Sequence, residues 1–275
     1  TYGGYANAQD VAVSADGTLW IPRFNVSTML VLAPNADPFP IDLSSQDPDG
    51  NPNASAVAVT TVNGVEKAFV ALERLDDRKD AQGNVLVSRL PSFLLQIDVA
   101  SKHFDAVATL QGRDPFGDIE QANGAFYLAA PGSFDDATET TAGIERFDPS
   151  SFTTTWLLGE SDLGASATAV SVNGACGAAI VADPTPTVNA TSLVTFDANA
   201  GKVLTTAENA LLSTPGFDLA GLSWMGDVLA VGDRRKSPTN GKYPIHLFDK
   251  AGACDLTMRP DAIFFDVPPV ALRSP

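Results

Sequence analysis

The stretch Asp10–Leu32, DVAVSADGTLWIPRFNVSTMLVL, is the pattern that the rest of the chain repeats. It contains a short apolar strand, an Asp16-Gly17 turn, an aromatic strand that ends at Pro22, a polar loop and a third strand. Variants of this unit recur downstream with a fourth strand at a spacing of roughly 50 residues, which is typical of β-propeller blades.

Two markers set the register of the repeats. A Gly-containing turn follows each first strand, at Gly17, Gly64, Gly124, Gly174 and Gly226. The third strand of the later units ends in an apolar residue followed by Asp, at Asp98, Asp148, Asp197 and Asp249. Because Asp recurs where the chain reverses, we expect it to cap backbone N–H groups of the turn.

We therefore predict an all-β fold, a β-propeller of four-stranded antiparallel blades in a single domain over 1–275. The five complete repeats are expected at approximately 8–45, 54–111, 115–159, 165–208 and 216–259. Closing strands at 262–273 would supply the inner part of a sixth blade, completed by sequence before Thr1. Six positions are favoured because a ring closed from both termini has no free edge. A five-bladed ring with a packed tail is the alternative.

Charge excludes some classes of function. The formal net charge is −16, with only 17 Lys and Arg residues. Nucleic acid and anionic membrane surfaces require a basic face, so neither is expected as a partner. No apolar run reaches the ~18 residues of a membrane-spanning helix. An acidic balance instead favours solubility, divalent cations or basic proteins.

The two cysteines are Cys176, after the first turn of the fourth unit, and Cys254, after the third strand of the fifth. In a meander blade both positions belong to one face of adjacent blades, so a disulfide between them is geometrically reasonable. A buried pair of free thiols is the alternative. A metal site is not expected from two thiols without a nearby His.

The longest loops all follow second strands, and the alternation of a meander places them on one face of a propeller. They are 74–90, 131–141, 183–190 and 233–243, joined there by the inter-blade loop 44–55. We call this the long-loop face. Because loops carry function more often than strands do, it is where we expect a binding site.

One cluster on this face resembles the start of a calcium loop. Asp47, Asp49 and Asn51 place oxygen ligands at alternate positions around Gly50, but the acidic residue that should end such a loop is missing. Clusters of Asp, Asn, Gly and Pro also form ordinary turns. Calcium is thus the one cofactor that the pattern allows, and a plain loop is the alternative.

The charged residues of three long loops are candidate interaction residues. They are Arg74, Asp76, Asp77, Arg78, Asp135, Asp136, Arg234, Arg235 and Lys236. The charged residues from Arg74 to Arg78 would form a lip at the mouth of the channel, or else a solvated loop. The basic triplet would bind an anion, or else lie on an ordinary surface loop.

No catalytic constellation is present, so no catalytic residue is predicted. His103 and His246 stand in different units, each within strand-like sequence. The chain has no GxSxG elbow, GxGxxG fingerprint, Walker loop or haem-attachment motif.

The units resemble the YVTN, NHL and regucalcin-like propellers of six or seven blades. The residues that carry the resemblance are 11–20, 95–98 and 144–148. The segments 6–10, 70–75 and 115–117 are most similar to YncE-like propeller lipoproteins of bacterial envelopes, especially those of myxobacteria. The resemblance implies an exported protein of the periplasm, outer membrane or cell surface, with a lipid anchor upstream.

Two functions follow. The first is a non-catalytic envelope propeller that binds a protein partner, or scaffolds a complex, through the long-loop face. The alternative, implied by regucalcin-type lactonases, is a metal-dependent hydrolase working at the central channel. Those enzymes hold a metal with Glu, Asn and Asp of inner strands, whereas the inner strands here offer Asp118 and Glu120 without an Asn partner.

Overall fold

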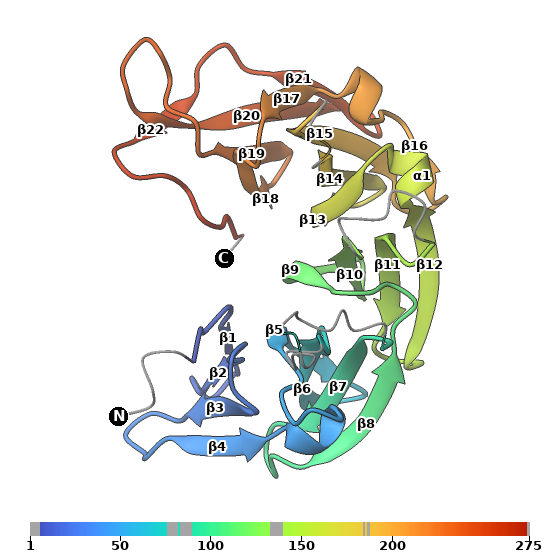
Figure 1. The fold of residues 1–275 in the computed structure, drawn as a ribbon, viewed down its shortest axis with the longest axis vertical. Helices are drawn as coiled ribbons and strands as arrows, with labels where there is room; N and C mark the ends of the chain where they lie inside the picture. The colour runs from blue at the N-terminus through green and yellow to red at the C-terminus, as the bar shows by residue number, and fades with distance from the viewer. Residues whose placement is uncertain are drawn as a thin grey trace. The chain divides into compact units, whose positions relative to one another are not determined.

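A computed structural model describes residues 6–75, 82, 90–132, 140–183, 185 and 188–273. These residues form five antiparallel sheets, and the first four strands of each sheet are neighbours in chain order, as the repeats predict (Figure 1). The described part of the chain contains no helix that is long and apolar enough to cross a membrane.

The first three sheets are simple four-stranded meanders. The first contains β1 (Ala12–Val13), β2 (Leu19–Ile21), β3 (Thr28–Leu32) and β4 (Phe39–Asp42). The second contains β5 (Ala54–Val62), β6 (Val65–Leu72), β7 (Phe93–Asp98) and β8 (Phe104–Thr109). The third contains β9 (Phe116–Ala122), β10 (Ala125–Ala130), β11 (Gly143–Asp148) and β12 (Thr153–Gly159).

The last two sheets have a divided outer strand. The fourth contains β13 (Ser166–Asn173), β14 (Cys176–Asp183), β15 (Ala190–Asp197), β16 (Lys202–Val203) and β17 (Leu212–Pro215). The fifth contains β18 (Leu219–Met225), β19 (Val228–Asp233), β20 (Tyr243–Ala251), β21 (Asp255–Met258) and β22 (Ile263–Phe265). The short helical turns are η1 (Ser44–Gln46), α1 (Glu160–Leu163) and η2 (Ala207–Asn209).

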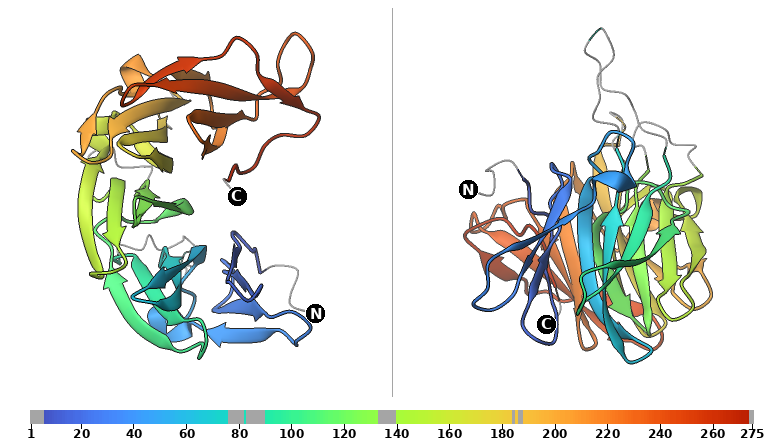
Figure 2. Two further views of the ribbon diagram at one scale, coloured as in Figure 1. Left: turned by 180° about the vertical axis from the view of Figure 1, so that it is seen from behind. Right: turned by 90° about the horizontal axis from the view of Figure 1, so that it is seen from below.

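The strands gather into two compact units. The first consists of 1–119 with 147–155, and the second of 120–146 with 156–275. Within the second unit, β18 lies beside β13 and β14 (Figures 1 and 2). That the whole chain is one propeller domain stays a prediction.

Apolar side chains between neighbouring sheets form the core of each unit. In the first unit, Trp20 and Met29 of the first sheet belong to one cluster with Val70 and Leu95 of the second. In the second unit, Ile180 and Leu193 of the fourth sheet cluster with residues of the fifth. Burial of such apolar surface holds successive blades together.

Second strands are the most deeply buried. All six residues of β10 are buried, as are all residues of β14 except its last. Each second strand pairs on both edges and is covered on both faces, which explains its continuous run of small apolar residues. Gly177 on β14 shows how tight the packing is, because an added Cβ would lie 2.2 Å from the ring of Phe196.

Three of the four repeated Asp residues cap turns as predicted. Asp98 accepts a hydrogen bond from the backbone N–H of Ser101, and Asp148 from that of Ser150. Asp197 accepts from the N–H groups of Asn199 and Ala200. The expectation is wrong for Asp249, whose carboxylate instead holds the side chain of Arg259 at 2.6 Å.

The C-terminal strand takes an outer position. We expected 262–273 to supply inner strands of a further blade, but β22 pairs with β20 at the outer edge of the fifth sheet. The reason is local, because β20 extends beyond the end of β21 and leaves backbone groups that β22 satisfies. A sixth position in the ring stays a prediction.

The predicted disulfide between Cys176 and Cys254 is confirmed, with the two Cα atoms 4.8 Å apart. Cys176 begins β14 and Cys254 precedes β21, so the bond joins the fourth and fifth sheets across a sequence separation of 78 residues. Both thiols are in the bond, and the chain has no free cysteine.

Removing the disulfide should destabilise the chain. The double variant Cys176→Ala/Cys254→Ala should lose about 2–5 kcal/mol in free energy of unfolding, because a long loop of the unfolded chain is no longer closed. Urea denaturation with and without reductant measures this. Reductant should destabilise the wild-type chain by a similar amount and leave the double variant unchanged. An equal effect of reductant on both would contradict the assignment.

Candidate functional site

The long loops connect second strands to third strands, as predicted. The connection from β6 to β7 spans 73–92, and shorter ones follow β10, β14 and β19. The predicted interaction residues Asp76, Asp77, Arg78, Asp135 and Asp136 lie outside the described residues, so their role stays a prediction. The two ends of the 73–92 connection are described.

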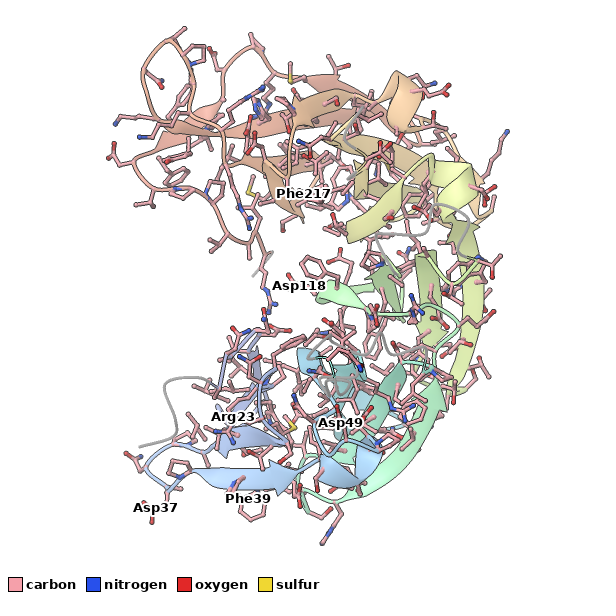
Figure 3. All side chains as sticks on the ribbon, in the orientation of Figure 1. Arg23, Asp37, Phe39, Asp49, Asp118 and Phe217 are labelled. Carbon is pink, nitrogen blue, oxygen red and sulfur yellow. A yellow bond between two sulfur atoms is a disulfide. The ribbon has the colours of Figure 1, made fainter. Side chains whose placement is uncertain are left out.

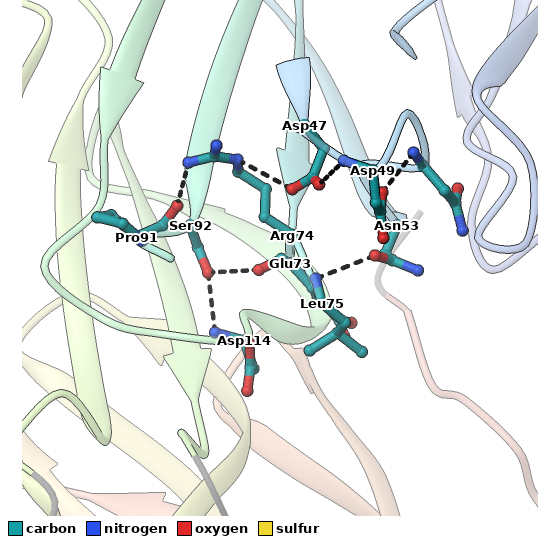
Figure 4. A network of polar contacts seen from close by, with 10 residues as sticks. Asp47, Asp49, Asn53, Glu73, Arg74, Leu75, Pro91, Ser92 and Asp114 are labelled. Carbon is teal, nitrogen blue, oxygen red and sulfur yellow. Dashed lines mark hydrogen bonds and ion pairs between the residues drawn. The ribbon is translucent and has the colours of Figure 1, made fainter. Parts of the chain in front are cut away.

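Hydrogen bonds join the start of the 73–92 connection to its end (Figure 4). The Arg74 guanidinium donates through Nη1 to the carbonyl of Pro91 at 2.8 Å. The Ser92 hydroxyl donates to the carbonyl of Glu73 at 3.0 Å and accepts from the backbone N–H of Asp114 at 2.9 Å. The connection therefore leaves and re-enters the second sheet through one fixed base.

The segment before β5 is part of the same base. The N–H of Leu75 donates to the Oδ1 atom of Asn53 at 3.0 Å, and the N–H of Arg74 donates to the carbonyl of Pro52. The Arg74 guanidinium also lies 3.8 Å from the ring centroid of Phe93, a cation–π contact. We call Asp47, Asn53, Glu73, Arg74, Ser92 and Asp114 the loop-base cluster.

The residues of the predicted calcium loop make structural contacts. Asp47 accepts from the N–H of Asp49 at 3.0 Å, and Asp49 accepts from the N–H of Asn51 at 2.7 Å. The second carboxylate oxygen of Asp47 lies 3.4 Å from Nε of Arg74. A guanidinium thus occupies one side of the Asp47 carboxylate. This arrangement fits the alternative of an ordinary turn, and calcium binding there stays a prediction.

Burial shapes the ion pair of Asp47 and Arg74. Their side chains are only 2% and 9% exposed, respectively. Desolvation raises the pKa of Asp47, and the charge of Arg74 opposes that rise. A carboxylate this buried needs its cation, because an unpaired buried charge costs several kcal/mol.

Glu73 is the most perturbed acid of the cluster. The residue is 7% exposed, and the described residues offer its carboxyl group no hydrogen-bond partner. Desolvation, with a smaller contribution from the negative charge of Asp114, raises the pKa of Glu73 to about 8. The Glu73 carboxyl is therefore mostly protonated at neutral pH.

Three residues of the cluster have left-handed backbone conformations. They are Asn53 with φ of 51°, Arg74 with φ of 61° and Asp114 with φ of 57°. Asn adopts this region readily, whereas Arg does so at some cost. Such strained positions concentrate at functional sites and persist where the surroundings hold them.

The three residues of the basic triplet make different contacts. Arg234 donates to the carbonyl of Pro269 at 3.2 Å, whereas Nη2 of Arg235 lies 3.8 Å from the Asp233 carboxylate. Lys236 lies over the ring of Tyr243 at 5.4 Å. Each cation therefore has a different neighbour, and anion binding by the triplet stays a prediction.

A buried carboxylate–imidazole pair accompanies the triplet, and sequence reasoning missed it. Nε2 of His246 lies 3.3 Å from Oδ2 of Asp233, whose side chain is 3% exposed. His103, by contrast, is exposed. A charged residue at the end of an apolar second strand is the signal that could have identified both Asp233 and Glu73.

The acids of the inner strand β9 are the residues that would have to hold a channel metal. Asp118 lies on β9 (Figure 3), and Glu120 accepts hydrogen bonds from the hydroxyl of Ser171 and the N–H of Val172. Among the described residues, no group of three or more His, Cys, Asp and Glu side chains is placed to hold a metal ion.

Comparison with known proteins supports the fold alone. No family model and no curated protein sequence matches the chain. A hydrazine synthase structure from Kuenenia stuttgartiensis has a TM-score of 0.63 at 15% identity, over 94% of this chain and 68% of that one. The structure of the Dos1 propeller has a TM-score of 0.55 at 10% identity, covering 93% and 61%.

An enzyme is among the similar structures as well. A streptogramin B lyase has a TM-score of 0.52 at 10% identity, over 99% of this chain and 89% of its own. With its five meander sheets, the chain is thus a β-propeller. Identities this low carry no activity from the similar proteins to this chain.

The raised pKa of Glu73 predicts a pH-dependent stability. Between about pH 4.5, the ordinary pKa, and about pH 8, the folded chain keeps a proton that the unfolded chain has lost. Stability from this group is therefore lost as pH rises through that window. Relative to wild type, Glu73→Gln should gain stability between about pH 5 and 8, by up to a few kcal/mol.

Urea denaturation across that range measures the effect, with the exposed Glu208→Gln variant as the control for removing one negative charge. Parallel stability profiles of Glu73→Gln and wild type would contradict the burial of an ionisable Glu73.

Breaking the buried ion pair should cost more than breaking an exposed one. Arg74→Met leaves the Asp47 carboxylate buried without its cation, and should lower the free energy of unfolding by about 3–5 kcal/mol. The control Arg259→Met removes the exposed pair with Asp249 and should lower the free energy of unfolding much less, because water screens an exposed pair. Chemical denaturation compares the two, and equal losses would show that the Arg74 pair is not desolvated.

Proposed function

We propose that this β-propeller is a non-catalytic binding or scaffold protein of the cell envelope. Its protein partner would contact the long-loop face, above all the 73–92 connection. The observation that supports this most strongly is the loop-base cluster, which fixes both ends of the longest connection to the second sheet. The base thereby sets the place on the second sheet from which a partner-binding connection would be presented.

The proposed interaction residues are the charged groups of these connections. Arg74 itself is buried, so we assign it to support of the loop. Contacts with the partner would fall to Asp76, Asp77 and Arg78, and to Asp135 and Asp136 of the connection after β10. The acidic excess of the chain favours a partner with a basic surface.

The proposed location is outside the cytoplasm. A disulfide persists in oxidising compartments, which supports export to the periplasm or cell surface. The resemblance to YncE-like envelope propellers supports the same location and would add a lipid anchor.

Shortening the long connection should separate binding from folding. We would replace 76–89 with a short Gly/Ser linker and keep Arg74, Pro91 and Ser92. Stability should change little, because the base retains its hydrogen bonds and loop length has a weak effect on closure entropy. Chemical cross-linking to envelope proteins, followed by mass spectrometry, should lose the main partner that the wild-type chain captures.

The matched control replaces 184–188, which contains none of the proposed contact residues, with Gly/Ser residues and should retain the capture. An unchanged partner profile in the folded 76–89 variant would contradict the proposal. A loss of capture together with unfolding would show instead that the connection is structural.

A further inference from the structure

The outer strand of the fifth sheet is interrupted opposite His246. β21 pairs with the second half of β20, from Phe248 onward, and β22 pairs with its first residues, Tyr243–Ile245. Between them the chain follows 259–262 without strand pairing, attached by the N–H of Arg259 to the carbonyl of Leu247. Within residues 188–273, His246 therefore has no strand partner on its outer side.

The fourth sheet has the same interruption, and there it is filled. β16 and β17 both pair with β15, and the gap lies beside Val194 and Thr195. The hydroxyl of Thr205 accepts from the N–H of Thr195, and the N–H of Leu204 donates to its carbonyl. Leu204 and Thr205 thus fill the gap beside β15.

The strand register shows how the fifth sheet differs from the fourth. In the fifth sheet His246 pairs with Val231, and at the corresponding place in the fourth sheet Val194 pairs with Ala179. In the same alignment, Asp233 corresponds to Val181. Val181 and Val194 are both buried in an apolar core cluster. The fifth sheet thus replaces an apolar pair with a carboxylate and an imidazole.

A pocket of about 700 Å³ lies at this interruption. This volume is within the range of small-molecule sites, which combine an apolar lining with a few converging polar groups. Its apolar walls include Pro238, Pro244, Met258, Pro260 and Phe264. His246, 21% exposed, is one of the polar groups that line it.

The lining of the pocket has more cations than carboxylates, with Arg235, Lys236 and Arg259 against Asp233 and Asp261. The Asp233 carboxylate accepts from the backbone N–H of Arg235 at 2.7 Å and lies beside the His246 imidazole and the Arg235 guanidinium. Lys236 and the half-exposed guanidinium of Arg235 also line the pocket. Asp261 is the other carboxylate of the lining, and it is exposed.

We propose that this pocket binds a small organic carboxylate with a short apolar body. Lys236 and Arg235 would hold the carboxylate by charge-assisted hydrogen bonds, and the proline and phenylalanine side chains would cover the apolar body. The site lies in the second unit and uses no residue of the 73–92 connection. Its test is therefore independent of the proposed partner binding.

The two histidines make the test specific. In a carbon–proton NMR spectrum of the full chain, each imidazole gives its own Cε1–Hε1 signal. Titration with hexanoate should shift the His246 signal saturably and leave that of His103, in the other unit, unchanged. Hexanamide and hexylammonium, which match hexanoate in size without its negative charge, should bind at least roughly tenfold more weakly.

Variants of two neighbouring arginines provide the matched comparison. Arg235→Gln should weaken hexanoate binding roughly tenfold, and Arg234→Gln, whose side chain faces Pro269, should leave it unchanged. Equal binding of hexanamide, equal shifts of both histidines or equal effects of the two substitutions would each overturn the proposal. Retention of the dispersed backbone amide signals of the wild-type chain confirms that a variant is folded in the comparison.

Discussion

The pairing of each second strand on both edges is the constraint on which the rest of the structure depends. β6, β10, β14 and β19 each lie between a first and a third strand, and apolar neighbours cover both faces. Every backbone group of such a strand needs a partner inside the sheet, because water cannot reach it. Apolar side chains add no polar groups that would need further partners, which is why second-strand segments such as AFYLAA and AAIVAD contain few polar residues.

Buried acidic residues occur where two of these strands end. Glu73 follows β6 and Asp233 ends β19, so both carboxyl groups are positioned by a buried strand and remain largely desolvated. Each then organises its surroundings differently. Glu73 belongs to the base of a long connection, in which Arg74 ties the loop to Asp47 and Pro91. Asp233 orients His246 beside a pocket. The ends of second strands thus support a loop in one blade and line a cavity in another, at positions one residue apart, because Asp233 corresponds in register to Leu72.

The sequence predicts much of the fold and little of the site. The five sheets, their strand order and the disulfide follow from short-range signals such as the Gly turns and the Asp residues of third strands. Asp249 departs from its pattern because Arg259, on the neighbouring strand segment, competes for its carboxylate. The loop-base cluster joins Asp47, Arg74, Ser92 and Asp114, which are far apart in sequence, so no local pattern reveals it. The interruption opposite His246 depends in turn on how β21 and β22 share one partner strand.

Native-state hydrogen exchange tests the central claim most directly, because it reports the protection of each backbone amide. The account predicts that the amides of β6, β10, β14 and β19 exchange most slowly. Protection should also continue past β6 into Glu73, Arg74 and Leu75. The N–H of Glu73 donates to the Asn53 carbonyl, that of Arg74 to the Pro52 carbonyl and that of Leu75 to the Asn53 side chain. Outer strands such as β4 and β12 should exchange faster. Equal or slower exchange in the outer strands, or rapid exchange immediately after Leu72, would contradict it.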